Sequence, residues 1–203
     1  EVVVPELPED PAFYLDYLLE LNLFETASYA ESDEQRTKQY QEEASRTIAK
    51  QNFNNEEDFL KSLEMYSEIS NFNKFNTPRV AQLSQRSNQF NLRTVRYTED
   101  MIEKLIRSDN HICYSFNLVD KFGDNGLISM IILEKQEDSL FIDTWLMSCR
   151  VLKRSMESFT LNKIVDEAKK VNVKKIVGEY ISTSKNEMVK DHYLNLGFTE
   201  KNG

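Results

Sequence analysis

Two runs of apolar and β-branched residues, 112–119 and 127–134, constrain the fold of this chain most strongly. They are joined by a segment rich in turn-forming residues, Asp120-Lys121-Phe122-Gly123-Asp124-Asn125-Gly126. This pattern predicts a β-hairpin. Because an isolated hairpin is only marginally stable in water, other strands and helices must pack against it.

The residues around this hairpin alternate between helical and strand patterns. Thr77-Pro78 is a start signal for a helix through Val80 and Leu83, and Thr98 is the expected N-cap of another. Strands are predicted at 89–96, 140–148 and 175–181, and helices at 155–171 and 186–196, the last ended by Gly197. The predicted class is therefore α/β (α+β), with a mixed central sheet.

The first 78 residues instead predict helices. One follows Pro11, and a second, mostly polar, covers 32–50. A third starts after Asn55 and carries the apolar residues Phe59, Leu60, Leu63, Met65 and Tyr66. The asparagine-rich stretch 71–78 is the expected boundary, giving a helical segment 1–78 and a second domain 79–203.

Charge is divided unequally along the chain, whose formal net charge is −9. Residues 1–78 hold 17 acidic and 6 basic side chains, whereas 79–203 hold 17 acidic and 19 basic ones. An acidic first part disfavours nucleic acid as a partner, because phosphate contacts need clustered Lys and Arg. The second part is the better place for an anionic ligand.

Cysteine and histidine are scarce: Cys113 and Cys149 are the two cysteines, and there are two histidines. This set favours neither a disulfide framework nor a protein-ligated metal, and it suggests reduced cysteines in a cytoplasmic protein. No apolar run approaches the roughly 18 residues of a membrane helix, so no membrane association is expected. Because the chain opens with Glu1 and not with Met, we expect a piece of a longer protein.

The predicted order of elements resembles the acyltransferase fold of the GNAT superfamily. Asn186 is followed by Tyr193-Leu194-Asn195-Leu196-Gly197-Phe198, which is similar to the closing motif of that superfamily, Asn…Tyr-x-x-Leu-Gly-Phe. The resemblance implies that the fourth strand leads into a loop and helix that hold the pyrophosphate of acyl-CoA.

Longer runs resemble a narrower family, the C-terminal region of FkbH-like proteins; they are RVAQLSQRSNQFNLRTVRYT (79–98), DKFGDNG (120–126), IDTWLMSCRVLKRSMES (142–158) and GEYISTSKN (178–186). Such proteins join a HAD-type phosphatase domain to a GNAT-like domain and load glyceryl units onto an acyl carrier protein in polyketide and methoxymalonate biosynthesis. The resemblance implies that residues 1–50 are the tail of the phosphatase part. No Asp-x-Asp nucleophile motif occurs here, so we expect no phosphatase activity from this chain.

The resemblance also implies a binding loop for CoA or the phosphopantetheine of a carrier protein, at Met147, Ser148, Arg150, Val151, Leu152, Lys153, Arg154 and Ser155. The superfamily loop reads Arg/Gln-x-x-Gly-x-Gly/Ala, and Lys153 and Ser155 stand where glycines are expected. Side chains at positions of positive φ cost about 1–2 kcal/mol each. Basic side chains at Arg150, Lys153 and Arg154 could offset that loss by binding phosphate.

For catalysis, Tyr193 matches the general acid of many GNAT enzymes and Asn186 the residue that contacts the pantetheine arm. Glu179 and Asp143 are the candidate bases, with solvent-facing strand carboxylates as the alternative. Cys149 could carry an acyl thioester, although buried packing is favoured.

Four polar residues in the matching runs are candidates for contact with the acceptor substrate: Asn88, Gln89, Asp124 and Asn125. For the last two, a turn is a sufficient explanation. Two hypotheses remain open. The chain is an acyltransferase domain acting on carrier-bound units, or a catalytically degenerate module that docks the carrier protein for an upstream HAD-type phosphatase.

Overall fold

A computed structural model describes residues 5–21 and 31–201, with side chains from residue 37 onward in the second range. Contacts divide the chain into two compact units, Glu1–Ala44 and Ser45–Gly203. Within the described ranges, no helix has both the length and the apolar character needed to cross a membrane.

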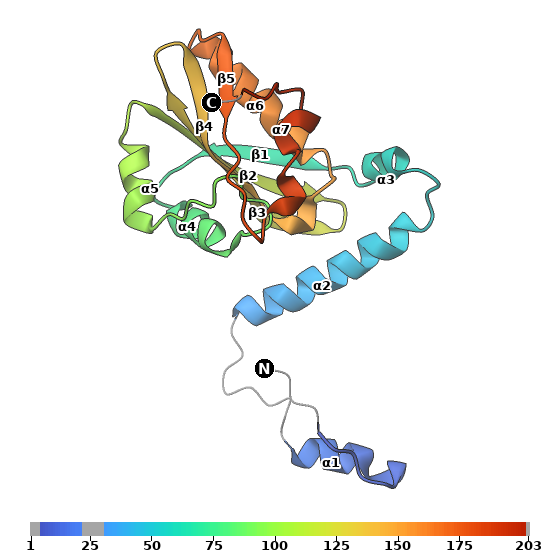
Figure 1. The fold of residues 1–203 in the computed structure, drawn as a ribbon. Coiled ribbons are helices and arrows are strands. Elements are labelled where there is room, and N and C mark those ends of the chain that lie inside the picture. The colour runs from blue at the N-terminus through green and yellow to red at the C-terminus, as the bar shows by residue number, and fades with distance from the viewer. Residues whose placement is uncertain (1–4, 22–30, 202–203) are drawn as a thin grey trace. The chain divides into compact units, whose positions relative to one another are not determined.

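The first unit holds the helices expected near its start (Figure 1). They are η1 (Pro11–Phe13) and α1 (Tyr14–Glu20), and Asp10 caps the first by accepting a hydrogen bond from the Ala12 amide. The long polar helix α2 (Glu31–Lys50) confirms the expected helix at 32–50, and its last residues belong to the second unit.

A five-stranded mixed sheet forms the second unit, in the order β1-β2-β3-β4-β5. The strands are β1 (Tyr66–Asn71), β2 (His111–Asp120), β3 (Gly123–Lys135), β4 (Ser139–Met147) and β5 (Lys175–Gly178). The first four are antiparallel neighbours, whereas β5 pairs with β4 in parallel. The expected hairpin is confirmed as β2–β3, and the mixed sheet confirms the predicted class.

Helices cover both faces of this sheet (Figure 1). After α2 the helices are α3 (Glu56–Ser62), which lies beyond the sheet, and α4 (Thr77–Arg86), α5 (Glu99–Ile106), α6 (Met156–Lys170) and α7 (His192–Asn195), which lie on its faces; the short turns are η2 (Cys149–Val151) and η3 (Glu187–Val189). One core cluster joins the sheet to α6 and α7 around Trp145, Phe116 and Ile164. A second cluster joins it to α4 and α5 around Val80 and Ile102. Because successive side chains of a strand point to opposite faces of the sheet, the strands contribute residues to two separate cores.

Two sequence predictions of secondary structure are wrong. The helix after Asn55 ends at Ser62, and Tyr66 starts strand β1, so the sheet draws a strand from the segment expected to be helical. Residues 89–96 form no regular strand; they are irregular, apart from one bridge between Asn91 and Leu146. Tertiary pairing overrides local pattern in both cases.

Smaller differences concern the end of the chain. Strand β5 stops at Gly178 and not at residue 181, and the helix expected at 186–196 is two short turns, η3 and α7. Gly197 does have the left-handed φ of +88° expected of a residue that ends a helix.

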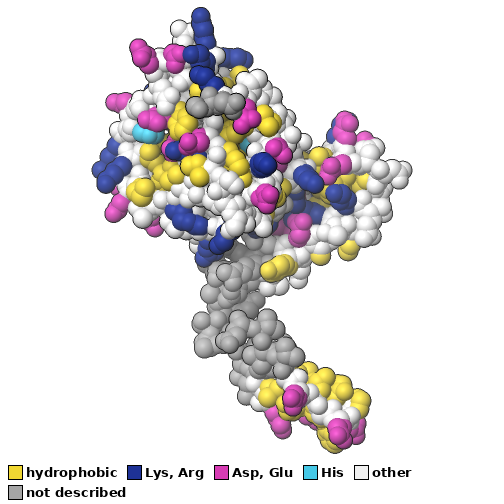
Figure 2. Space-filling model, viewed as in Figure 1, with side chains coloured by type: hydrophobic (Ala, Val, Ile, Leu, Met, Phe, Trp, Pro, Cys, Tyr) yellow, Lys and Arg dark blue, Asp and Glu magenta, His cyan; other side chains and the backbone are white. Residues whose placement is uncertain are grey.

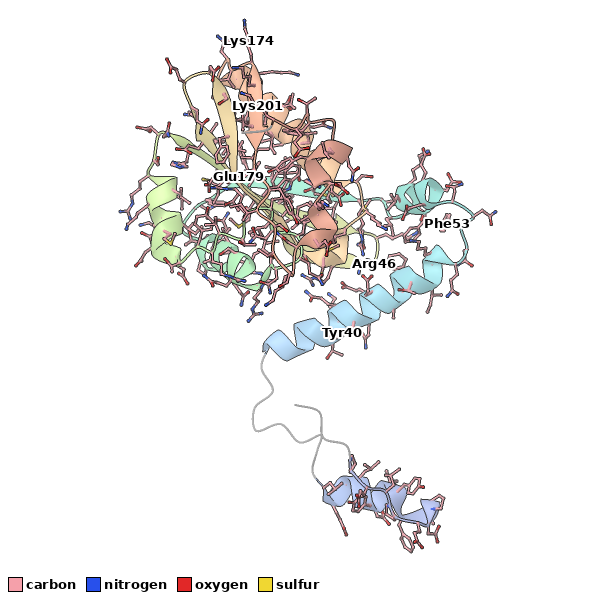
Figure 3. All side chains as sticks on the ribbon, viewed as in Figure 1. Tyr40, Arg46, Phe53, Lys174, Glu179 and Lys201 are labelled. Atoms are coloured by element: carbon pink, nitrogen blue, oxygen red, sulfur yellow. The ribbon has the colours of Figure 1, made fainter. Side chains whose placement is uncertain are left out.

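A buried carboxylate, Asp120, fixes the β2–β3 turn. It accepts two hydrogen bonds from Arg46 of α2, at 2.7 and 2.9 Å, and one from Arg154 at 3.2 Å. Asn125 and the Phe122 amide also donate to it. Figure 3 labels Arg46 on α2. The turn is thereby held to the last residues of α2 and to the loop before α6.

We predict that Asp120→Asn destabilises the protein by about 3 kcal/mol, because it removes the buried negative charge to which the guanidinium groups of Arg46 and Arg154 donate. Urea unfolding followed by circular dichroism measures this loss. The control Asp138→Asn removes an exposed partner of Lys175 and should leave the unfolding midpoint nearly unchanged. Equal effects of the two variants would contradict the role of Asp120.

The same network has a pH dependence. Burial alone would raise the pKa of Asp120, but hydrogen bonds from Arg46, Phe122 and Asn125 lower it below its ordinary value. The stabilisation is therefore present above about pH 4 and is lost as the pH falls through the lowered pKa. Asp120→Asn should remove this part of the acid sensitivity.

Candidate functional site

The candidate site lies where β5 ends and its neighbour β4 continues. The two strands pair from Ser139–Lys175 to Ile142–Gly178, and β5 then ends while β4 continues to Met147. At this point β4 carries a β-bulge: Thr144 pairs with Ile132 and Ile142 with Leu133, so Asp143 has no partner on β3. Bulges redirect side chains, and this one turns Asp143 away from the regular ladder.

Beyond the bulge, residues Phe90–Leu92, here called the inserted segment, take the place beside β4 that β5 has left. The Met147 amide donates to the Phe90 carbonyl at 3.1 Å, and the Leu92 amide to the Trp145 carbonyl at 3.5 Å. On its other side, the Leu92 carbonyl accepts from the Ile181 amide at 2.8 Å. The chain therefore satisfies the free edge of β4 with its own backbone.

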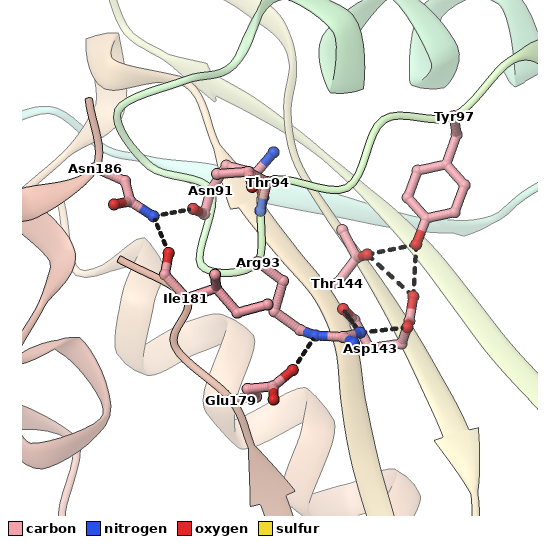
Figure 4. A network of polar contacts seen from close by, with 9 residues as sticks. All are labelled: Asn91, Arg93, Thr94, Tyr97, Asp143, Thr144, Glu179, Ile181 and Asn186. Carbon is pink, nitrogen blue, oxygen red and sulfur yellow. Dashed lines mark hydrogen bonds and ion pairs between the residues drawn. The ribbon is translucent and has the colours of Figure 1, made fainter. Parts of the chain in front are cut away.

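Arg93 follows the inserted segment and pairs with both candidate bases (Figure 4). Its guanidinium donates to Asp143 at 2.5 Å and to Glu179 at 2.7 Å, and also to the Asp143 carbonyl. Burial opposes the charge, but the two carboxylates raise the pKa of Arg93 above its usual value. One guanidinium group is thus shared between the two carboxylates. Glu179 lies just after β5 and is half exposed, so it faces solvent in part, whereas Asp143 is a quarter exposed.

Besides Arg93, Asp143 has a second partner, the neutral side chain of Tyr97. The Tyr97 hydroxyl lies 2.5 Å from the carboxylate and 2.7 Å from the Thr144 hydroxyl. Burial and the hydrogen bond to Asp143 raise the pKa of Tyr97, so the phenol keeps its proton and acts as donor. The carboxylate is engaged on both oxygens.

Asn186 is completely buried and holds the inserted segment in place (Figure 4). Its amide nitrogen donates to the carbonyls of Asn91 and Ile181, each at 2.9 Å. Its oxygen accepts from the amide and hydroxyl of Thr183 and from the Tyr180 hydroxyl. In this arrangement the amide nitrogen and oxygen of Asn186, expected to contact a pantetheine arm, are both engaged within the chain. Asn186 is a positioning residue.

We predict that Asn186→Ala costs about 3 kcal/mol of stability, because several buried hydrogen-bonding groups lose their partner. Amide hydrogen exchange should also accelerate at Met147 and Ile181, whose amides donate to the inserted segment. The control Asn88→Ala removes a half-buried asparagine whose amide oxygen accepts from Arg96. Unchanged exchange at Met147 in Asn186→Ala would contradict the role of Asn186.

Tyr193, the expected general acid, lies against the backbone of β5. A Cβ atom built on Gly178 would come within 2.4 Å of the Tyr193 ring, so a glycine is required there. The phenol oxygen is buried and has no hydrogen-bond partner among the described residues. Burial raises the pKa of Tyr193, which keeps the hydroxyl protonated.

We predict that Gly178→Ala destabilises the protein by about 2 kcal/mol, because the new methyl group displaces the Tyr193 ring. In a Tyr193→Leu background the same change should cost much less, since the ring atoms that clash are absent. Urea unfolding of the four proteins in this double-mutant cycle measures the coupling. Simple additivity would show that ring and glycine do not interact.

The loop before α6 keeps the backbone shape of a glycine loop without its glycines. Lys153 and Ser155 both have a φ of +61°, in the left-handed region that normally favours glycine. A carboxylate of the chain already lies there: the Lys153 amide donates to Glu157 of α6 at 3.1 Å. Its negative charge opposes an incoming phosphate.

Other residues predicted to bind CoA have different environments. Met147 and Val151 are buried in the core and Leu152 packs against it. Arg154 is buried and directed to Asp120, away from any phosphate role. Arg150 is exposed and hydrogen-bonded to the Ser148 hydroxyl. The exposed members of the loop are Cys149, Arg150, Lys153 and Ser155.

The predicted acceptor residues do not form one site. Asn88 accepts from Arg96, and Gln89 is exposed beside the inserted segment. Asn125 is buried on Asp120, and Asp124 caps its own turn by accepting from the Gly126 amide. Within the described ranges, no hydrogen bond joins the first pair to the second.

The two cysteines differ. Cys113 is buried, and burial raises the pKa of its thiol to about 12. Cys149 is exposed, so the favoured expectation of buried packing is wrong for that residue. In the part of the chain that the structure describes, no three metal-binding side chains gather.

Several functional residues escaped the sequence analysis: Arg93, Tyr97 and Glu157. Arg93 stood in the run 89–96 that was assigned to a strand, and Tyr97 comes directly after that run. Glu157 carried a usable signal, because a carboxylate in the first turn of a helix favours nearby free amides.

Searches against protein-family models and against curated proteins find no match. Solved structures do match. The ribosomal-protein-S18-alanine N-acetyltransferase from Escherichia coli is 17% identical, with a TM-score of 0.51 over 68% of this chain and 80% of that one. An aminoglycoside 6'-N-acetyltransferase from Acinetobacter baumannii is 9% identical, with a TM-score of 0.52 over 68% and 94%.

A third similar structure is an aminoglycoside N-acetyltransferase in complex with CoA, 11% identical, with a TM-score of 0.52 over 68% of this chain and 91% of that one. At such identities the likeness defines the fold and nothing finer. The second unit has the fold of GNAT acetyltransferases, as the sequence resemblance predicted.

Proposed function

We propose that this chain is the GNAT-like part of an FkbH-like protein, and that it docks an acyl carrier protein without transferring acyl groups itself. Its partner would be a HAD-type phosphatase domain upstream in the same cytoplasmic protein. The observation that carries the proposal is the inserted segment, which occupies the β4 edge in the opening between β4 and β5.

CoA does not fit the residues present at this site. The amide of Lys153 faces the carboxylate of Glu157, and Arg154 is held by Asp120. The edge of β4 is paired with Phe90 and Leu92. The Lys153 amide, the Arg154 side chain and the β4 edge thus already have partners from the chain. The same argument applies to the phosphopantetheine arm of a carrier protein, so docking must use the protein surface.

Charge supports a docking surface next to this loop. Burial, and then the nearby charges of Arg150 and Arg86, lower the pKa of Arg79, which places these three guanidinium groups close together. Arg79 and Arg86 lie on α4, and Arg150 on η2. Figure 2 shows basic side chains of the second unit bordering apolar ones on the visible face. Carrier proteins are acidic, so this cluster would steer their approach.

We expect the wild-type chain to bind apo- and holo-carrier protein alike, and to show no calorimetric binding of acetyl-CoA. Arg79→Glu should weaken carrier binding about tenfold, because it introduces repulsion at a charged rim. The control Lys104→Glu makes the same charge change on exposed α5. Surface plasmon resonance at two salt concentrations measures both, with slower association at the higher one.

Equal weakening by Arg79→Glu and Lys104→Glu would reject this docking surface. Micromolar binding of acetyl-CoA would reject the absence of transfer, because it would require the inserted segment and Glu157 to give way. Binding of holo-carrier alone would indicate that the phosphopantetheine arm enters the site.

A second candidate function, acyl transfer, is favoured by one observation. The Tyr193 hydroxyl is protonated and unpartnered, as a general acid for a leaving thiolate should be. Against it, both candidate bases are held in ion pairs with Arg93. The acetyl-CoA titration decides between the two functions.

A further inference from the structure

A phenylalanine that is almost fully exposed, Phe75, lies in the turn between β1 and α4. Among the large apolar side chains that the structure describes, it is the most exposed, at 95%. Single exposed apolar residues are ordinary on protein surfaces. Phe75 differs from them in how firmly its backbone is held and in the charges of the residues beside it.

Asparagine side chains hold the turn that carries Phe75. The Asn73 side-chain oxygen accepts from the amides of Phe75 and Asn76, at 2.9 and 3.0 Å. The Asn73 amide in turn donates to the Asn76 side-chain oxygen at 2.9 Å. The side-chain nitrogens of Asn73 and Asn76 both donate to the Asn71 carbonyl, at 3.1 and 3.0 Å. Because the turn is already ordered, binding through Phe75 costs little further backbone entropy.

Phe75 also shares one face of α4 with two arginines. The Thr77 amide donates to the Asn73 carbonyl at 3.0 Å, so the helical path begins within the turn. Phe75, Arg79 and Arg86 follow one another at intervals of four and seven residues, a spacing that keeps side chains on one helix face. All three are exposed. The buried residues of α4 lie on the opposite side of the helix; they are Thr77, Val80, Ala81 and Ser84.

The sequence around Phe75 contains no acidic side chain. Residues 69–98 hold five basic side chains and no acidic one, and the five include Lys74, Arg79 and Arg86. This composition favours an anionic partner for the exposed face of α4. Residues 1–35, by contrast, hold ten acidic side chains and no basic one, which disfavours a long polyanion such as nucleic acid. A compact acidic protein covers a smaller area and is therefore the partner that fits the basic face best.

We propose that Phe75 is the apolar anchor of the docking surface formed by Arg79, Arg86 and Arg150, and that its ring enters an apolar pocket of an acidic protein, an inference that rests on the proposed function, in which this partner is a carrier protein. Buried aromatic anchors contribute most of the affinity of an interface, whereas charges at its rim mainly set the association rate. Phe75 and the arginines therefore have separable roles.

Surface plasmon resonance of the full chain against apo-carrier protein separates these roles. Phe75→Ser removes the ring and leaves the hydrogen bonds of the turn, so the urea midpoint should not change. We expect dissociation about tenfold faster than in wild type, with an association rate within about twofold. Arg79→Glu should instead slow association. The matched control, Phe13→Ser, removes a phenylalanine that is 57% exposed in the acidic first unit, and it should change neither rate.

A second variant, Phe75→Trp, keeps an aromatic anchor and adds a fluorescent reporter. The chain has one tryptophan, Trp145, and it is buried, so the emission of an exposed indole reports on position 75. We expect an affinity within about threefold of wild type and a blue shift of the emission when apo-carrier protein binds. Binding without any blue shift would overturn the burial of this side chain in the complex.

The remaining outcomes separate the anchor from the docking surface. An unchanged dissociation rate in Phe75→Ser, with Arg79→Glu still slowing association, would overturn the anchor and leave carrier docking intact. No binding of carrier protein by the wild-type chain would reject both.

Two other occupants of this face would each overturn the inference. A wild-type dimer in sedimentation that Phe75→Ser converts to a monomer would assign the ring to a second copy of the chain. Binding of a poly(U) oligonucleotide more tightly than the carrier protein, lost in Phe75→Ser, would assign the ring to stacking on bases.

Discussion

The pairing of Phe90–Leu92 with the far half of β4 is the contact on which the rest of the site depends. A parallel strand that stops early leaves a row of backbone groups that must find partners. Here the partner is an irregular segment from a distant part of the sequence, and the bulge at Asp143 marks where the exchange begins. Arg93, Asn91 and Asn186 then hold this segment through hydrogen bonds to β4 and to the chain after β5.

Asp120 has a comparable role on the other side of the loop before α6. It collects Arg46, Arg154 and Asn125 around one carboxylate and so connects α2, the β2–β3 turn and that loop. The side chains of Arg154 and Asn125, which were expected to contact a ligand, instead donate hydrogen bonds to Asp120. Both ends of the GNAT-like opening are therefore stabilised by contacts within the chain.

Much of the fold could be predicted from local pattern, because the β2–β3 hairpin, β4 and α6 combine clear periodicity with clear turn and cap residues. Strand β1 could not be predicted, since Tyr66–Asn71 carries a weak, partly exposed pattern and forms a strand only by pairing with β2. The irregular path of residues 89–96 depends on β5 ending early, a long-range fact that no window of sequence contains. The sequence singled out Tyr193 and Asp143, but their contacts with Gly178 and Arg93 arise from tertiary structure and could not be predicted from it.

The turn between Lys153 and Ser155 has a broader meaning. Lys153 and Ser155 adopt a positive φ that usually favours glycine. The geometry of this turn is therefore imposed by the strand and the helix that it connects, and not by the amino acids in the turn. The backbone conformation of the loop is thus present although the glycine motif by which it is normally recognised is absent. A scan for glycines at these positions would pass over this chain, whereas a comparison of shapes would not.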